Sequence, residues 1–288
     1  MSKLKSLKVM FHVEKMQLAD LPFAVKLANT MKWGTTMEDF DFNMRLEPEG
    51  CWVLFDGQNR VGIATCINYG SAGWFGNLVV SQKYKKMGAG TFLLNHAISY
   101  LQNKGATLIG LYAYPHLQHF YEKMGFKPDK EFVVLKAKTI FIKENTRLNQ
   151  ADAEDLQKIV EFDRQYFGAA RRKVLEQIFL RNQNFLCVTQ ENNKIIGYAA
   201  AKIANSTAEV GPLVCIKKRP EEAAILLKAV LSKLNGAEGI MYLPATQEAL
   251  IETAASAGFQ EEFRLLRMFL GSHIGEDCWY LAESLERG

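Results

Sequence analysis

A short basic segment with two glycines is the part of the chain whose residue types best suit chemistry. Lys83, Lys85 and Lys86 come just before Gly88 and Gly90. Glycines at a sharp turn let the backbone direct several N–H groups at one point, and the lysines add positive charge there. A helix that starts at this turn would direct the positive end of its dipole at the same point. These features predict a binding site for a phosphate or pyrophosphate group.

The same residues would also suit an ordinary turn between a strand and a helix, with lysines that contact only solvent. Leu93 stands where a dinucleotide-binding fingerprint would place its third glycine, and the Gly-Lys-Ser/Thr sequence of a P-loop is missing. The two glycines are therefore weak evidence when taken alone.

The segments around this loop predict the elements that position it. The apolar run over residues 74–80 is typical of a strand buried on both faces. The segment after the loop is an amphipathic helix whose apolar stripe consists of Leu93, Leu94, Ala97, Ile98 and Leu101. Elsewhere in this half, strands are predicted at 7–14, 51–55, 61–67, 107–113, 132–137 and 140–143, with helices from residue 20, from residue 35 and over 115–123.

Two longer motifs resemble those of one known family. Residues 85–90, Lys-Lys-Met-Gly-Ala-Gly, resemble the [Q/R]-x-x-G-x-[G/A] loop that binds acyl-CoA in the GNAT superfamily of N-acetyltransferases. Residues 120–126, Phe-Tyr-Glu-Lys-Met-Gly-Phe, resemble the closing segment of that superfamily. Because both motifs occur in the expected order and separation, the chain is identified as a member. Lys85 replaces the usual Arg or Gln; it keeps a charge but lacks the planar fork, so we expect less defined geometry rather than lost binding.

The resemblance implies acetyl-CoA as the cofactor. It makes Tyr121 the candidate acid for the departing thiolate, since the ordinary phenol pKa of about 10 lies above that of a thiol; a tyrosine that only packs is the alternative. The N–H groups of residues 78–80 would polarise the thioester carbonyl if the strand carries a bulge. The implied cofactor-binding residues are Leu78, Val79, Val80, Lys85, Lys86, Met87, Gly88, Ala89, Gly90 and Thr91.

The strand before the loop offers no carboxylate, so a general base must come from elsewhere. Among the acids of the second helix, Asp39 is preferred because, together with Trp33 and Gly34, it matches a segment of one two-domain group in the superfamily. An acid at a helix start is the alternative interpretation, and no base is needed if the amine binds already neutral. Trp33 and Trp74 are candidates for the acceptor pocket, although each would also suit the core. No metal site is expected.

The sequence pattern of the first half restarts near residue 144. The intervals between matching glycines are fourteen residues in both halves, then forty-nine and forty-seven. The matching pairs are Gly62 with Gly197, Gly76 with Gly211, and Gly125 with Gly258. Several matching positions at nearly the same spacing indicate two copies of one fold. The second half also resembles the C-terminal domain of the two-domain group.

The second copy lacks the residues that favour a phosphate in the first. Glu221 and Glu222 fall opposite Lys86 and Met87, and Ala223, Ala224 and Ile225 fall opposite Gly88, Ala89 and Gly90. Two carboxylates at a helix start would repel a phosphate. We therefore predict an α/β (α+β) protein with two tandem GNAT-like domains, each a mixed, mostly antiparallel central sheet flanked by helices. Residues 1–143 would form the catalytic domain and 144–288 a degenerate, non-catalytic one.

The composition agrees with a soluble protein of two domains. The chain has 288 residues, of which 48% are hydrophobic and 23% charged. The net charge of +4 is too small to indicate nucleic acid but suits an anionic small ligand. Five scattered cysteines without a C-x-x-C pair predict free thiols in a reducing compartment, and neither a signal peptide nor a membrane span is predicted. A cytoplasmic location is expected.

The expected activity is transfer of an acetyl group from acetyl-CoA to a primary amine of a small molecule. A non-catalytic acyl-CoA sensor or interaction module is the alternative from another class. The expected partner is the small-molecule amine, with no nucleic acid and no membrane. Both a monomer and a homodimer are compatible with the sequence.

Overall fold

The computed structural model describes residues 10–143, 146, 148–272 and 277–288. The chain folds into two compact units. The first contains the residues up to Asn68 together with Gly73–Ala106, and the second contains Tyr69–Ala72 and Thr107–Gly288.

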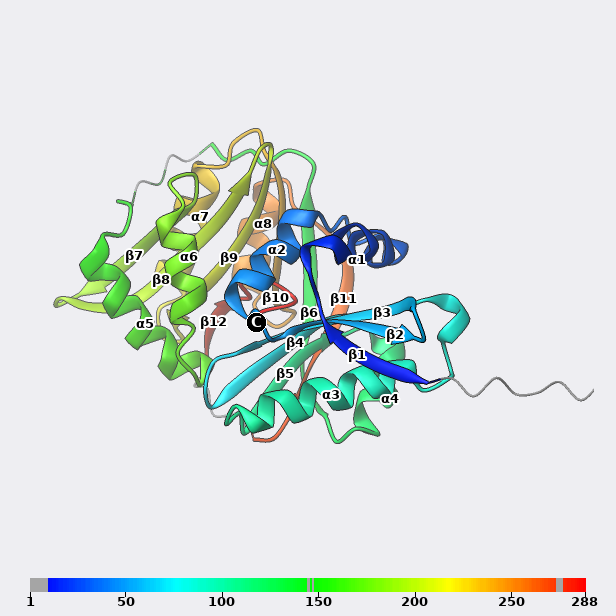
Figure 1. Cartoon of the computed structure of the whole chain (residues 1–288). Helices are drawn as coiled ribbons and strands as arrows, with labels where there is room; N and C mark the ends of the chain where they lie inside the picture. Colours follow the sequence, from blue (N-terminus) through cyan, green and yellow to red (C-terminus); the bar gives the residue numbers. More distant parts are fainter. Residues whose placement is uncertain (1–9, 144–145, 147, 273–276) are drawn as a thin grey trace, which may run out of the picture. The chain divides into compact units, whose positions relative to one another are not determined.

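The first unit is built on an antiparallel sheet in the order β1-β2-β3-β4 (Figure 1). Its strands are β1 (Phe11–Lys15), β2 (Cys51–Asp56), β3 (Asn59–Asn68) and β4 (Ala72–Val80). The strands predicted at 51–55 and 61–67 are confirmed as β2 and β3, and the predicted buried strand over 74–80 is confirmed as β4. The expected first strand begins later than predicted, at Phe11, and residues 7–9 lie outside the described part.

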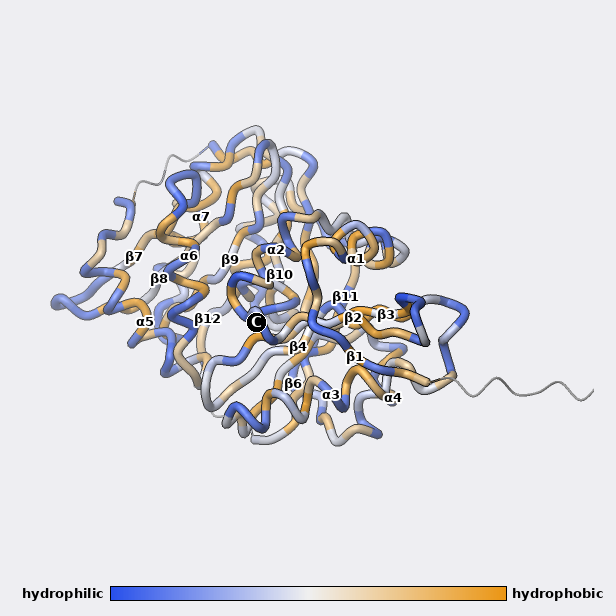
Figure 2. The backbone as a smooth tube through the Cα atoms, viewed as in Figure 1, coloured by the Kyte–Doolittle hydropathy of each residue, from blue (hydrophilic) through white to orange (hydrophobic). Residues whose placement is uncertain are grey.

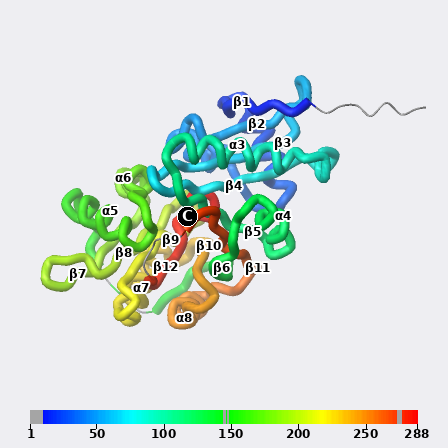
Figure 3. Tube along the Cα trace, turned by 90° about the horizontal axis from the view of Figure 1, so that it is seen from below, coloured from blue at the N-terminus to red at the C-terminus, as the bar shows by residue number. Residues whose placement is uncertain are grey.

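Helices cover both faces of this sheet. On one face, α1 (Leu21–Ala28) and α2 (Met37–Leu46) contribute Ala24 and Phe40 to a core with Ile63 of β3. The other face is covered by α3 (Ala89–Asn103). Leu93 of α3 packs closely against Gly62, and Leu101 packs so closely against Gly73 that a Cβ on this glycine would collide with it. Figure 3 shows α3 running along the strands of this unit.

The second unit contains a larger sheet in the order β5-β11-β6-β10-β9-β8-β7, with β12 paired to β9. Only β9 and β10 pair in parallel among the pairs described. The strands are β5 (Leu108–Ala113), β6 (Lys127–Ala137), β7 (Phe185–Glu191), β8 (Lys194–Ala204), β9 (Thr207–Ile216), β10 (Glu238–Pro244), β11 (Gln260–Leu270) and β12 (Cys278–Leu281). The helices are α4 (Gln118–Glu122), α5 (Ala153–Phe167), α6 (Arg172–Leu180), α7 (Pro220–Ser232) and α8 (Glu248–Ser256).

The two sequence repeats exchange their last strands within this sheet. β6 ends the first repeat but pairs with β10 of the second, and β11 ends the second repeat but pairs with β5 of the first. β6 and β11 also pair with each other. Because the two strands have equivalent places in their repeats, each can fill the position of the other, as in domain swapping. The predicted domain boundary between residues 143 and 144 separates the two sequence repeats and remains a prediction. The two compact units have other boundaries, near residues 68–73 and 106–107.

The repeat itself is visible in the structure. Gly62 and Gly197 lie on the matching strands β3 and β8, and Gly76 and Gly211 on β4 and β9. The third pair, Gly125 with φ +89° and Gly258 with φ +96°, follows α4 and α8 in the left-handed conformation that glycine tolerates. The predicted fold class, two mixed and mostly antiparallel GNAT-like sheets with flanking helices, is confirmed.

The core of the second unit lies under α7 and α8, which are side by side on its sheet (Figures 1 and 3). Along α5 and α6, hydrophilic and hydrophobic stretches alternate, as expected of amphipathic helices (Figure 2). The prediction of a strand at 140–143 is wrong: Ile140 is buried in this core and donates its N–H to Ala237 outside any strand. In the described part of the chain, every helix is too short or too polar to cross a bilayer.

Candidate active site

Strand β4 carries a bulge directly before the residues whose N–H groups the family resemblance makes candidates for binding the carbonyl. Thr65 pairs with Gly76 and Ile63 pairs with Val79, so Asn77 and Leu78 together face a single residue of β3. Such a bulge turns the backbone and takes N–H groups out of the regular ladder. The structure thus meets this condition, and the use of the N–H groups of residues 78–80 remains a prediction.

The glycine loop connects β4 to α3 and is exposed. After a 3₁₀ turn over Gln82–Tyr84, Lys86 and Gly88 both have left-handed backbone conformations, with φ of +64° and +87°. Gly88 is the N-cap of α3, and the first helical hydrogen bond runs from Phe92 N to Gly88 O at 2.9 Å. The N–H groups over residues 88–91 precede this bond, and a helix leaves such groups for other partners. The side chains of Lys85 and Lys86 extend into solvent beside them.

The loop is anchored by Tyr84, which the sequence argument did not use. Its buried ring lies 6.2 Å from that of Phe11, and its hydroxyl donates to Asp56 Oδ2 at 3.1 Å. The main-chain oxygen of Tyr84 accepts the N–H of Met87 at 3.2 Å. These contacts hold the exposed end of the loop against the sheet.

The groups of the loop fit a pyrophosphate. Free main-chain donors at a helix start and two exposed lysines provide the charge and the hydrogen bonds that such an anion needs. A Cβ built on Gly88 would meet no atom within 4 Å, so a ligand can approach the backbone closely there. Residues 85–91 would hold the group, and the bulged strand is part of the same unit.

Tyr121 belongs to the second unit and lies on the short helix α4. Only 6% of the residue is exposed, and its ring contacts Phe120 and Phe126 at centroid distances of 5.0 and 6.0 Å. Burial raises the pKa of Tyr121 above its ordinary value of 10.0, so the phenol keeps its proton at neutral pH. A protonated phenol suits a proton donor and also suits a packing residue.

Asp39 and Thr36 form a capping box at the start of α2. Asp39 Oδ2 accepts hydrogen bonds from Thr36 N at 2.7 Å and Thr36 Oγ1 at 2.8 Å. This arrangement satisfies main-chain donors at a helix start. The structure therefore shows a helix-capping contact for Asp39, whose catalytic role remains a prediction.

The two tryptophans predicted at the acceptor site belong to the first unit. Trp74 lies on β4 opposite Ile67 and is only 2% exposed. Trp33 is partly buried and packs against the core formed with α1. Both residues contribute to packing, and their part in acceptor binding remains a prediction.

Asn77 is a residue of the bulge that the sequence argument missed. This part of the strand has no carboxylate, and the carboxamide of Asn77 is not a base. Its sequence signal is an asparagine inside an apolar strand, directly after a glycine, because Asn tolerates the left-handed conformation better than most residues.

The second repeat has a matching bulge but a different helix start. Gly211 and Pro212 of β9 together face Ala200 of β8. The following helix α7 begins at Pro220 with Glu221 and Glu222 in its first turn. The carboxylates compensate the helix dipole where the first repeat has glycines and lysines.

The chain itself covers β9 beyond this bulge. β12 pairs antiparallel with β9 from Cys278 opposite Ile216 to Leu281 opposite Leu213. The next residue, Ala282, donates its N–H to the main-chain oxygen of Tyr242 on β10 at 2.9 Å. This segment thus joins the two strands where they diverge.

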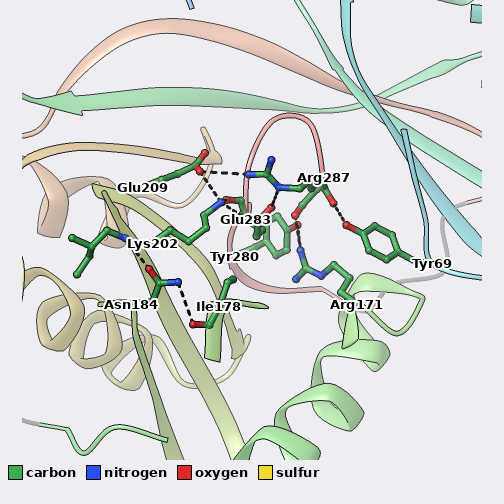
Figure 4. Close-up of polar contacts among 11 residues, drawn as sticks. Tyr69, Arg171, Ile178, Asn184, Lys202, Glu209, Tyr280, Glu283 and Arg287 are labelled. Carbon is green, nitrogen blue, oxygen red and sulfur yellow. Dashed lines mark hydrogen bonds and ion pairs between the residues drawn. The ribbon is translucent and has the colours of Figure 1, made fainter. Parts of the chain in front are cut away.

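A buried polar network fixes the segment that follows β12 (Figure 4). Arg171 forms an ion pair with Asp163 at 2.7 Å and donates to the main-chain oxygen of Gly288 at 2.6 Å. Glu283 pairs with Arg287 at 2.8 Å and with Lys202. Burial by itself would raise the pKa of Glu283, but the charges of Arg287 and Lys202 outweigh it and lower that pKa below its ordinary value of 4.5.

Residues 18–126 match the model of the acetyltransferase (GNAT) family, and residues 159–279 match a model of an acetyltransferase (GNAT) domain. The chain belongs to the GNAT acetyltransferases. This GNAT protein carries two such domains in tandem, as the repeat in its sequence predicted.

Solved structures share the fold of this GNAT protein over nearly its whole length. A provisionally assigned acetyltransferase from Pyrococcus horikoshii matches with a TM-score of 0.76 at 21% identity, over 96% of both chains. The GCN5-related N-acetyltransferase from Sphaerobacter thermophilus matches with a TM-score of 0.65 at 14% identity, over 92% of this chain and 96% of the other. A tandem GNAT protein from the clavulanic acid biosynthesis pathway has a TM-score of 0.60 at 12% identity, over 93% of this chain and 100% of the other. The search of curated proteins gave no match.

Proposed function

We propose that this GNAT protein transfers the acetyl group of acetyl-CoA to a primary amine of a small molecule. The observation that carries the proposal is the presence, in one unit, of the bulged strand β4 and of the glycine loop with its unused main-chain donors. The bulge suits a carbonyl group and the loop suits a pyrophosphate. Acetyl-CoA contains both groups.

The chain's own residues would have separate roles. The N–H groups over residues 88–91, with Lys85 and Lys86, would hold the pyrophosphate, and those of residues 78–80 would polarise the carbonyl. Acetyl-CoA supplies the thioester when bound. Tyr121 would give its proton to the departing sulfur. Burial raises the pKa of the phenol, which keeps it protonated but also makes it a weaker acid, so the role depends on its position at the sulfur rather than on its acidity. Asp39 stays the candidate for accepting the amine proton.

We further propose that the second repeat is a non-catalytic domain that binds no cofactor. Two observations support this proposal. Two glutamates, Glu221 and Glu222, lie in the first turn of α7, and β12 pairs alongside β9. A cytoplasmic location is proposed because all five cysteines are buried free thiols, as expected in a reducing compartment.

The experiment is calorimetric titration with coenzyme A, followed by thioester turnover with a panel of alkyl, aryl and sugar primary amines. The proposal requires both binding and amine-dependent release of free thiol. Binding without turnover on any amine would favour the acyl-CoA sensor instead. Absence of binding would reject the proposed site.

A further inference from the structure

Asn77 has a backbone conformation that a strand interior does not normally contain. Its φ is +51°, in the left-handed region, and it lies within β4 between the paired residues Gly76 and Val79. Glycine would adopt this conformation at no steric cost. Strained positions of this kind cluster at functional sites, so the choice of a side chain here calls for a reason.

The side chain of Asn77 is buried with one of its two polar atoms unused. The residue is 6% exposed, and its Nδ2 donates to Thr65 Oγ1 at 3.1 Å. Among the described residues, Oδ1 has no hydrogen-bond partner. Nearly all buried polar groups in proteins have partners, and an unsatisfied one lowers stability. The carboxamide therefore leaves a strong acceptor available at a cost to the fold.

The position of this acceptor suits the substrate that attacks the thioester. Asn77 directly precedes the N–H groups proposed to polarise the carbonyl, those of residues 78–80. Thr65 lies two residues from Ile63 on β3 and therefore on the same face of the sheet. Ile63 packs with α1 and α2, so the Asn77 carboxamide lies on the face covered by those helices rather than by α3.

We propose that Asn77 Oδ1 accepts a hydrogen bond from an N–H of the acceptor amine, so that Asn77 is a substrate-binding residue. This inference rests on the proposed acetyl transfer. A primary amine in its neutral form has two N–H bonds and one lone pair, and binding one N–H at Oδ1 helps to direct the lone pair at the carbonyl carbon. The N–C bond then forms, the C–S bond breaks, the sulfur takes up a proton and the nitrogen loses one.

The chemistry of the carboxamide restricts the substrate class. An amide oxygen orients an N–H but does not take up its proton at neutral pH, so Asn77 is not the base. It also accepts nothing from a tertiary amine, which has no N–H in its neutral form. This excludes tertiary amines and agrees with the primary amine proposed above, bound in its neutral form, so the rate should rise with pH as free amine becomes available.

The test uses two substitutions at this residue and one matched control. Asn77→Gly keeps the backbone conformation and removes the acceptor, and Asn77→Asp keeps an acceptor at both oxygens. Asn205→Gly is the control, because Asn205 has a similar φ of +54° but lies in the turn between β8 and β9. Each chain is titrated with coenzyme A and assayed with acetyl-CoA and the best amine among spermidine, tyramine and glucosamine.

We expect Asn77→Gly to lower kcat/KM for the amine about tenfold and to leave the coenzyme A affinity unchanged. A tenfold loss is near the largest effect expected from removing one hydrogen bond between neutral groups. Asn77→Asp should keep most of the activity and extend it to lower pH, because a carboxylate also accepts a proton. Asn205→Gly should match the wild type. Wild-type kcat/KM in Asn77→Gly, or equal losses in Asn77→Gly and Asn77→Asp, would overturn the inference while leaving the proposed function intact. A wild-type chain that acetylates none of these amines would overturn both.

Discussion

The main-chain oxygen of Ala282 occupies the space that a side chain on Gly211 would need. Gly211 lies at the bulge of β9 with φ +145°, a conformation open to glycine and rarely to other residues. In the first repeat, the strand beyond the matching bulge is the part proposed to face the thioester. In the second, the chain's own backbone lies against the bulge.

This contact leads us to expect a single coenzyme A per chain. β12 already pairs with β9 over residues 213–216, so the edge of β9 that would otherwise meet a ligand is hydrogen-bonded. Isothermal titration calorimetry gives the stoichiometry directly. Two molecules bound per chain would show that the second repeat is functional.

Gly88→Glu should abolish coenzyme A binding, because the new carboxylate stands at the proposed phosphate position and repels it. Gly105→Glu is the matched control at the other end of α3, where the glycine also has φ above +80° and open space around it. Both substitutions strain the backbone alike, so both should lower stability by about 1 kcal/mol. Equal affinities in the two variants would place the phosphate elsewhere.

Tyr121→Phe should slow turnover without weakening coenzyme A binding. The ring keeps its contacts with Phe120 and Phe126 and loses only the hydroxyl, which is needed when the thiolate departs. General acid catalysis contributes about 10²–10⁴-fold, and we expect a loss of kcat at the lower end of that range. Steady-state kinetics, with binding measured separately, provides the test. A variant that keeps its full kcat would assign Tyr121 to packing alone.

Asp39→Asn and Thr36→Ala should each destabilise the protein by about 1 kcal/mol, because each breaks the same capping box. Thermal unfolding of both variants measures this effect. Thr36→Ala leaves the carboxylate in place, so it is also the control for catalysis. The predicted role of Asp39 as a base requires that Asp39→Asn lose far more turnover than Thr36→Ala.

Acid should destabilise the protein through Glu283. Its pKa is lowered in the folded state, so its contribution to stability is present above the unfolded value of 4.5 and is lost as the pH falls further through the folded value. Melting temperatures measured from pH 6 to below pH 4 should therefore fall. Glu283→Gln leaves Arg287 and Lys202 without this carboxylate and should cost about 3–5 kcal/mol at neutral pH. The variant should also show a shallower loss between pH 4.5 and pH 3; an unchanged slope would assign the acid sensitivity to other groups.

Much of the candidate site could be predicted because it is local in the sequence. The loop, the helix start and the bulged strand lie within residues 74–91, and backbone preferences and short-range hydrogen bonds determine their shape. Asn77 could not be recognised in the same way. Its unused Oδ1 follows from burial and from the single contact with Thr65, which belong to the packed structure.

The sequence by itself determined the family, the tandem repeat and the loss of the phosphate loop in the second copy, because glycine spacing and helix-start charges are properties of short segments. Only the tertiary structure decided which strands pair. β6 and β11 have equivalent patterns, so each could pair within its own repeat or with the other, and local preferences do not distinguish the two pairings. The cover of β9 by β12, and the network of Arg171 and Glu283, likewise depend on contacts between residues up to 117 positions apart along the chain. Contacts over such distances form only when the whole chain is packed.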